Sequence, residues 1–410
     1  MLNTVRLARE QRNLSAVISD EILERLGRDT ASARGLPNAA FVDPAFHELE
    51  KDLLFPHTWT FAAAASFVPN RGDVLPLKVA GRPVILVRGN DNAIRAFHNV
   101  CPHRGARLVT ETQRKKVVLT CPYHGWSFGL DGGLRGRPHY HGPGSHQPAG
   151  DEGHDEACLF PIRSVTWHDW VFVNLDGQAE PFETYIAPVE REFVGSDLSV
   201  FRRSEPDMHF EFASNWKLVA ENFCDFYHVF MVHPALDIAM ADTTRRAMRP
   251  NGRHMFNGYE FAGSATGIAP DDATLGLPVQ PGRSRENAQS MVFGLIFPNA
   301  VINVYPESLQ FVHFEPIATD RTIMHMWFYY VDGAASAPEH ANARARIFES
   351  WAQLNAEDEG ICRQLQEGRA CEAYDGGRMA PYWDAGTIHF HRQVALAMRH
   401  DDVPRDPGSS

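Results

Sequence analysis

Two short loops, each carrying one cysteine and one histidine, constrain this chain more than any other feature of its sequence. The first loop reads Cys101-Pro102-His103-Arg104-Gly105, and the second reads Cys121-Pro122-Tyr123-His124-Gly125-Trp126, with 17 residues between His103 and Cys121. Proline fixes φ and glycine tolerates positive φ, so both loops can turn tightly. The spacing therefore allows each loop to point a thiolate and an imidazole at the same metal centre.

Two kinds of metal centre use two cysteines and two histidines. Structural Zn²⁺ accepts a tetrahedral Cys₂His₂ set. A 2Fe–2S centre can instead take sulfur ligands on one iron and nitrogen ligands on the other. Zinc fingers usually separate their cysteine pair from their histidine pair, whereas each loop here carries one of each. The order of the ligands therefore favours the iron–sulfur centre.

This segment also resembles the Rieske family, including the arginine-glycine after the first histidine and the glycine-tryptophan after the second. The resemblance implies a 2Fe–2S cluster held by Cys101, His103, Cys121 and His124. Histidine ligation raises the potential of such a cluster relative to all-cysteine clusters. We therefore expect a ferredoxin or a flavin reductase to supply its electrons.

The overall composition excludes several classes of protein. A formal net charge of −12 argues against a nucleic-acid partner. Six cysteines scattered over 410 residues do not form a disulfide framework, and an iron–sulfur site suits the reducing cytoplasm. The sequence shows neither a secretory signal nor a run of 18 apolar residues, so we expect no membrane span.

The pattern of the chain predicts an α+β protein in three parts. Residues 1–58 are expected to be a helical N-terminal segment, with an amphipathic piece at 17–26 and helical spacing over 41–60. Residues 59–175 alternate short strands and turns, which predicts a small antiparallel β-domain around the cysteine–histidine loops. Within it, 165–173 is expected to be a single last strand, and 135–155 a long surface loop.

The third part, residues 176–410, is expected to be a catalytic domain. A probable strand around Phe210 is followed by a helical run over 215–233, and residues 290–331 supply strands separated by proline-containing turns. Residues 339–367 return to a helical period. We expect an antiparallel sheet with one face covered by helices, a helix-grip-like arrangement.

A second set of metal-ligating residues occurs in the helical run. On a regular helix Asp225 and His228 lie about 60° apart, but His228 and His233 lie about 140° apart. A local widening of the helix, or its end at Pro234, would be needed to bring both imidazoles to one ion. Taken alone, the pair favours two ordinary core or surface histidines over a metal site.

A carboxylate for the same ion would come from the late helix. Ile347, Trp351, Leu354, Ile361 and Leu365 mark its expected buried stripe, and Asp358 lies in phase with them. A buried carboxylate is costly unless it is paired or binds a metal, so the alternatives are a buried salt bridge and a ligand. Glu357 is rotated off the stripe by about 100°, and we expect it to be solvated.

His228, His233 and Asp358 together would form a 2-His-1-carboxylate triad, which holds non-haem Fe(II) and leaves positions open. The runs 215–233 and 357–368 resemble the catalytic-domain motifs of Rieske non-haem iron oxygenases. The resemblance covers about 50–400. It implies one 2Fe–2S cluster and one mononuclear Fe(II) per chain, O₂ as a substrate, and electrons that reach the chain from NAD(P)H through a reductase or ferredoxin.

The resemblance also implies an assembly and a role for Asp225. Members of the family form ring-shaped trimers, in some cases with a small β-subunit, in which electrons cross between subunits. Asp225 aligns with the carboxylate that links a cluster histidine of one subunit to the iron ligand His228 of the next. Asn222 and Tyr227 are expected only to support the site.

The substrate is expected to be a small organic compound that binds among apolar residues. The residues expected to line the pocket are Phe223, Phe226, Val229, Phe230, Phe293, Leu295 and Phe297. Such a pocket favours an aromatic compound, as does the aspartate at 225, where some amine-acting members carry glutamate. The alternative is a quaternary amine of the choline, betaine or carnitine type, held by an aromatic cage. A Rieske electron carrier with no catalytic iron is the non-enzyme alternative.

Overall fold

The computed structural model describes residues 17–148, 157–239, 246–260, 276–281 and 290–399. The chain forms two compact units: residues 55–182 form one, and residues 1–54 with 183–410 form the other. The N-terminal segment, expected as a separate part, thus belongs to the same unit as the C-terminal half.

The unit of residues 55–182 is built from antiparallel strands, as expected. A six-stranded sheet has the order β1-β10-β9-β4-β3-β2, and a four-stranded sheet has the order β5-β6-β7-β8. The strands are β1 Thr60–Ala64, β2 Val74–Val79, β3 Arg82–Arg88, β4 Ile94–His98, β5 Leu119–Thr120, β6 Ser127–Phe128, β7 Leu134–Arg137, β8 Gln147–Pro148, β9 Pro161–Trp167 and β10 Trp170–Asn174.

Strand β3 shows how the larger sheet places its core on both faces. Side chains alternate between the faces of a strand. Val84 and Leu86 pack into a cluster with residues of β9 and β10. Ile85 and Val87 pack on the other face into the cluster that contains both Cys101 and Cys121. The loops with the cysteines are therefore anchored in one of the two cores of this unit.

Two expectations for this unit were wrong. The single strand expected over 165–173 is the hairpin β9–β10, because the chain turns at His168, whose φ is +51°. The loop expected over 135–155 contains β7 and β8, which pair through Gly136 and Arg137. Its histidines 139, 141 and 146 are exposed, as expected, and residues 149–156 lie outside the described part.

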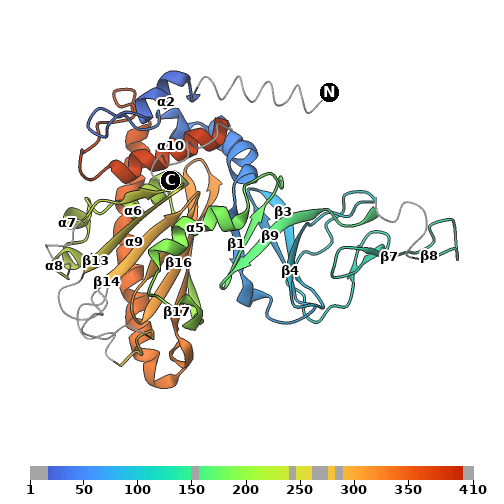
Figure 1. Ribbon diagram of the computed structural model, residues 1–410. Helices are drawn as coiled ribbons and strands as arrows, with labels where there is room; N and C mark the ends of the chain where they lie inside the picture. Colours follow the sequence, from blue (N-terminus) through green and yellow to red (C-terminus); the bar gives the residue numbers. More distant parts are fainter. Residues whose placement is uncertain (1–16, 149–156, 240–245, 261–275, 282–289, 400–410) are drawn as a thin grey trace. The chain divides into compact units, whose positions relative to one another are not determined.

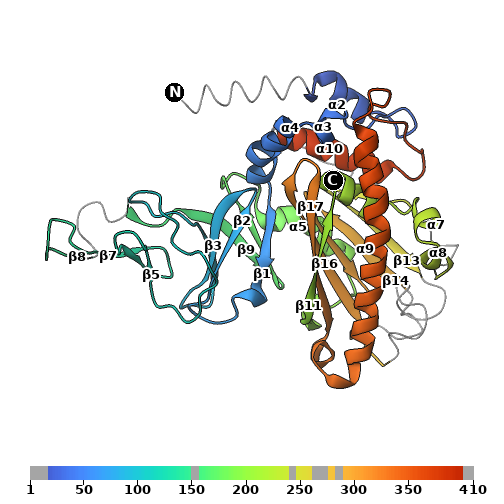
Figure 2. The same cartoon turned by 180° about the vertical axis from the view of Figure 1, so that it is seen from behind.

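The other unit is a seven-stranded antiparallel sheet with helices, as the sequence predicted. The sheet order is β11-β17-β16-β15-β14-β13-β12. Its strands are β11 Phe201–Phe212, β12 Arg249–Asn251, β13 His254–Glu260, β14 Ser290–Ile296, β15 Ala300–Val304, β16 Ser308–Ala318 and β17 Arg321–Val331. The long helix α9 (Ala341–Arg369) runs along one face of this sheet (Figures 1 and 2).

Shorter helices complete this unit. They are α2 Asp20–Leu26, α3 Ala39–Val42, α4 Pro44–Leu49, η1 Glu50–Leu54, α5 Phe182–Glu192, η5 Leu198–Val200, α6 Trp216–Cys224, α7 Val229–Val232, α8 Pro234–Ala239, η8 Asp332–Ala335, η9 Pro338–His340 and α10 Ala385–Arg399. In both ribbon views α2 lies beside α10 (Figures 1 and 2), and Asp20 accepts a hydrogen bond from Arg399 at 2.5 Å.

The asparagine-tryptophan-lysine opening of the helical run has a structural explanation. The Asn215 side chain caps α6 by accepting a hydrogen bond from the Lys217 N–H at 3.1 Å. Trp216 Nε1 donates to Glu50 at 3.0 Å, and Lys217 Nζ donates to the other oxygen of Glu50. Glu50 and Lys217 have no solvent exposure. Helix α6, which leads into the candidate site, is thus fixed to the N-terminal segment.

We expect that replacing one member of this buried pair will destabilise the unit strongly. In Lys217→Met, Glu50 becomes a buried charge without its cation, which should lower the free energy of unfolding by about 3–5 kcal/mol. The double variant Glu50→Gln/Lys217→Met should recover most of that loss, because it leaves no uncompensated charge. Denaturant unfolding of the purified variants measures both. Equal losses in the single and double variants would contradict this account.

Candidate metal centres and active site

The two cysteine–histidine loops adopt the same backbone turn. The Cys101 N–H donates to the Ala106 carbonyl at 2.8 Å, and the Cys121 N–H donates to the Trp126 carbonyl at 2.8 Å. In each loop a glycine four residues after the cysteine has φ of +74°. That conformation favours glycine, which has no Cβ. The repeated motif therefore encodes two equivalent turns.

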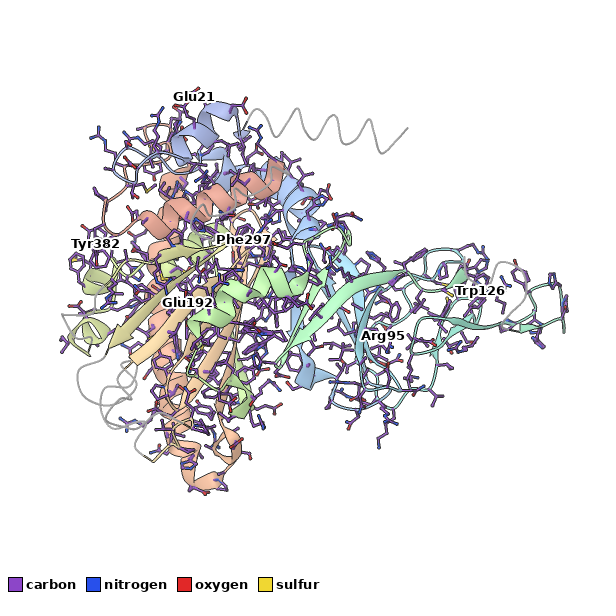
Figure 3. The ribbon with its side chains drawn as sticks, in the orientation of Figure 1. Glu21, Arg95, Trp126, Glu192, Phe297 and Tyr382 are labelled. Carbon is purple, nitrogen blue, oxygen red and sulfur yellow. The ribbon has the colours of Figure 1, made fainter. Side chains whose placement is uncertain are left out.

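The cysteines of these loops are buried, whereas His103 is exposed and His124 is half-buried. Cys101 and Cys121 are each 2% exposed. Burial, and then contact with the Cys121 thiol, raise the pKa of Cys101, so this thiol stays protonated unless a cation stabilises its thiolate. The rings of His103 and His124 lie 4.7 Å apart between centroids. The His103 ring stacks on the ring of Trp126, which is labelled in Figure 3, with 4.6 Å between their centroids.

The donor set fits a 2Fe–2S cluster better than a single zinc ion. The Nδ1 atom of His124 is buried and has no hydrogen-bond partner, whereas Arg104 donates to its Nε2 at 2.5 Å. Nδ1 is thus left for a ligand. Among the described residues, three metal-ligating side chains gather within 4.8 Å only at His228, His233 and Asp358. The four loop residues do not converge on one point, as tetrahedral zinc requires, but form a sulfur pair and a nitrogen pair.

The helical run expected over 215–233 is broken, and the break brings its two histidines together. Helix α6 ends at Cys224, and Asp225 has extended backbone with φ −94° and ψ 121°. Helix α7 begins after His228 and ends before His233, which has φ −123° and ψ 65°. The five-residue spacing, unfavourable on one regular helix, is therefore accommodated by a short helix with a histidine at each end.

His228, His233 and Asp358 converge as the sequence predicted. The Asp358 Oδ1 atom lies 2.9 Å from His233 Nε2 and 3.5 Å from His228 Nε2. Asp358 is 6% exposed and lies on the buried stripe of α9, as expected. Two imidazole nitrogens and one carboxylate oxygen this close together can hold a divalent ion and leave its other coordination positions open.

Two further carboxylates contact the Nδ1 atoms of these histidines, the ring nitrogens that do not face Asp358. Glu357 Oε2 lies 2.7 Å from His233 Nδ1, and Asp225 Oδ2 lies 3.3 Å from His228 Nδ1. A carboxylate on the outer nitrogen fixes the ring and leaves Nε2 as the inward donor. Glu357, expected to be solvated, is 32% exposed at its side chain, but that side chain is long enough to reach His233 from beside the buried stripe.

The electrostatics of the triad favour positive charge at this site. Burial opposes a charge on His228, but hydrogen bonds with Asp225 and Asp358 outweigh burial and raise its pKa to about 9. Burial favours protonation of Asp358, but the two histidines outweigh it and lower its pKa to about 2. The carboxylates thus stabilise positive charge on the imidazoles, and the same arrangement would stabilise a bound divalent ion.

A cavity of about 550 Å³, including its open mouth, lies beside the triad. Of the residues expected to line it, Phe223, Phe226, Val229 and Phe293 do so, whereas Phe230, Leu295 and Phe297 do not. Further lining residues, which the sequence reasoning did not assign to it, are Leu236, Met291, Tyr305, Trp351 and Leu354. Leu365, expected on the buried stripe of α9, is 41% exposed, and Cys362 is buried in its place.

Comparison with known protein families matches both parts of the chain. The Rieske [2Fe-2S] domain matches residues 58–146, and the ring hydroxylating alpha subunit (catalytic domain) matches residues 199–400. The chain belongs to the Rieske non-haem iron oxygenases. As a Rieske oxygenase it uses a 2Fe–2S cluster and a mononuclear iron, so the electron-carrier alternative no longer applies.

Curated relatives of this Rieske oxygenase carry more specific names. The carnitine monooxygenase oxygenase subunit of Escherichia coli (strain K12) is 27% identical, over 89% of this chain and 94% of the relative. The glycine betaine monooxygenase oxygenase subunit of Pseudomonas aeruginosa (strain UCBPP-PA14) is 25% identical, over 87% of each. These names agree with the quaternary-amine alternative better than with the aromatic substrate that the sequence reasoning preferred.

A solved structure confirms the fold. The quaternary ammonium Rieske monooxygenase in complex with an inhibitor superposes with a TM-score of 0.74, at 21% identity, over 92% of this chain and 98% of that chain. No helix in the described part of the Rieske oxygenase combines the length and the hydropathy that a membrane crossing requires.

We expect Glu357→Gln to weaken metal binding at the triad. Loss of the carboxylate that orients His233 should raise the dissociation constant for a divalent ion about 10- to 100-fold. Titration of metal-depleted protein with Co²⁺, followed by its absorption spectrum, measures this change. The matched control is Glu359→Gln on the same helix, which removes a carboxylate paired with Arg363 at 3.7 Å. Equal affinities in the two variants would contradict the orienting role.

Proposed function

We propose that this chain is the oxygenase component of a monooxygenase system that oxidises a small quaternary ammonium compound. A separate NAD(P)H-dependent reductase or ferredoxin delivers the electrons. The proposal rests mainly on relatives that align over nearly their whole length and are named as monooxygenases of quaternary ammonium compounds, such as the carnitine monooxygenase subunit. The lining of the cavity supports it independently.

The cavity has the chemistry of a site for an organic cation. Five aromatic side chains line it, and they are Phe223, Phe226, Phe293, Tyr305 and Trp351. Four of them pack in two pairs: Trp351 stacks on Phe223 with 5.8 Å between ring centroids, and Phe226 meets Phe293 edge-on at 5.2 Å. Aromatic faces attract quaternary ammonium groups. Two carboxylates, Asp225 and Asp358, also line the described part of the cavity.

We assign the ligands as the sequence predicted. Cys101, His103, Cys121 and His124 hold the 2Fe–2S cluster, and His228, His233 and Asp358 hold the iron. When bound, these groups supply stored electrons and the activation of O₂. The protein's own contribution is to orient the imidazoles through Asp225 and Glu357 and to place the substrate among aromatic rings beside the open side of the triad.

The proposed function is tested by oxygen uptake with a panel of substrates. The iron-loaded oxygenase, an NADH-dependent reductase and each compound are combined, and O₂ consumption and product are measured together. We expect quaternary amines to support uptake with about one NADH and one O₂ per hydroxylated product. Naphthalene and 2-aminobenzenesulfonate should support none. Turnover of the aromatic compounds and not of the amines would overturn the proposal.

Iron counts should separate the two assigned sites. We expect about three irons per chain in the wild-type protein, about one in Cys121→Ser, and about two in Asp358→Ala. Metal analysis gives these numbers, and the paramagnetic signal of the reduced cluster should disappear only in Cys121→Ser. Retention of three irons in either variant would remove the corresponding ligand assignment.

We also propose that the chain works as a homotrimer in which Asp225 joins the iron of one subunit to the cluster of the next. The partial exposure of Asp225, 26% of its side chain, supports this, because it leaves a surface for a neighbouring subunit while Oδ2 contacts His228.

Asp225→Asn should retain both metals but reduce substrate-coupled turnover at least 10-fold, since a neutral amide orients an imidazole less well. Iron analysis and single-turnover reoxidation of the cluster by O₂ measure the two effects. A variant with the reoxidation rate of the wild type would contradict the joining role.

A further inference from the structure

Three histidines form a row across neighbouring strands at one edge of the seven-stranded sheet. His209 of the edge strand β11 lies directly opposite His325 of β17, and His325 lies directly opposite His313 of β16. These strands are consecutive in the sheet (Figure 2). Directly opposed residues of antiparallel strands point to the same face of a sheet. The three imidazoles therefore share one face.

The histidine row lies on the face of the sheet that is turned away from the cavity. Phe293, which lines the cavity, belongs to a row of opposed residues that continues through Asn303, Gln310 and Phe328. His325 precedes Phe328 by three residues on β17, and residues an odd number apart on a strand point to opposite faces. The row is thus separate from the iron triad, whose residues line the cavity.

Two of the three imidazoles meet nitrogen to nitrogen. The Nδ1 atoms of His209 and His325 lie 2.8 Å apart. Only one proton fits between them, because two N–H groups would otherwise face each other, so the contact joins one donor to one lone pair. His209 is exposed, and the His325 side chain is 21% exposed. Solvent ions can therefore reach this pair.

The ring of His325 is held from two sides. Glu315 Oε2 lies 2.9 Å from its Nε2. An ionised carboxylate only accepts, so Nε2 carries the proton and the lone pair of the neutral ring points from Nδ1 to His209. His313 stacks on this ring with 6.0 Å between centroids, and Asn299 donates to the Nε2 atom of His313 at 3.1 Å. Metal-binding histidines typically donate their other nitrogen to a carboxylate, as His325 does.

We propose that His209 and His325 bind one divalent transition-metal ion through their Nδ1 atoms, and that Glu315 orients His325 for it. Two nitrogens bonded to one ion at about 2.0–2.1 Å lie about 2.9–3.4 Å apart, so the pair has only to widen slightly. The ion takes the place of the shared proton, which His209 then carries on Nε2. Imidazoles suit Cu²⁺, Ni²⁺ and Zn²⁺, and water fills the remaining positions. This site is independent of the proposed function.

Calorimetric titration of the iron-loaded enzyme with Ni²⁺ tests the inference, with the iron content measured in the same samples. We expect the wild type to bind about one Ni²⁺ per chain without releasing iron. His209→Gln and His325→Gln should each weaken this binding at least 10-fold, because one nitrogen ligand is lost. With half an equivalent of Cu²⁺, the paramagnetic resonance spectrum should show splitting from two imidazole nitrogens, and from one in either variant.

His139→Gln is the matched control. His139 is also exposed and its ring lies 4.7 Å from that of His146, but its Nδ1 accepts from the Gly144 N–H at 2.9 Å. We expect this variant to bind Ni²⁺ as the wild type does. Because His209 is exposed, His209→Gln keeps the test decisive if His325→Gln fails to fold.

The role of Glu315 has its own pair of variants. Glu315→Gln should weaken Ni²⁺ binding about 10-fold, since an amide orients the imidazole less well. Glu211→Gln removes a carboxylate that accepts from Arg321 at 2.8 Å on the same face, and it should leave the affinity unchanged. Equal affinities in these two variants would contradict the orienting role.

Three results would overturn the site itself. They are an unchanged affinity in His209→Gln, an equal loss in His139→Gln, and the release of one iron for each Ni²⁺ bound. None of them bears on the proposed function, because turnover of the iron-loaded His209→Gln variant should equal that of the wild type.

Discussion

The contact between His233 and helix α9 is the interaction on which the candidate iron site depends. One ring nitrogen of His233 meets Asp358 at 2.9 Å, and the other meets Glu357 at 2.7 Å. Two adjacent residues of one long helix thus hold both nitrogens of a side chain that is 124 residues away in sequence. Because α9 is a continuous helix packed on the sheet, it gives a rigid reference to which the broken segment α6–α7–α8 is attached.

The other end of that segment is fixed by buried charges. Asn215 caps α6, and Trp216 and Lys217 both bond to Glu50 from the N-terminal segment. One turn further along α6, Glu221 accepts a hydrogen bond from His391 of α10 at 2.5 Å. The sequence motif shared with the family is therefore partly a set of anchors. It holds the helix in place so that the chain can leave regular geometry at Asp225.

Sequence reasoning found the residues whose chemistry follows from their type and spacing, and it missed features that depend on backbone geometry or on the reach of a side chain. The cysteine–histidine loops could be predicted because proline and glycine restrict the turn around each ligand. The phase of Asp358 on α9 could be predicted because helical periodicity is regular. The break at Asp225 has no glycine or proline to mark it. The turn at His168 places a non-glycine residue at positive φ, which sequence pattern does not reveal. The helical angle places Glu357 beside the buried stripe, and it reaches His233 only because its side chain is long.

The donor set of the triad has a consequence for which metal the chain acquires. His228, His233 and Asp358 offer two nitrogen ligands and one oxygen ligand. Such a site follows the general order of divalent affinities, in which Co²⁺, Ni²⁺, Cu²⁺ and Zn²⁺ bind more tightly than Fe²⁺. Correct occupancy is then decided by which ions the cell makes available during synthesis rather than by the site itself, and mismetallation becomes the intrinsic hazard of this architecture.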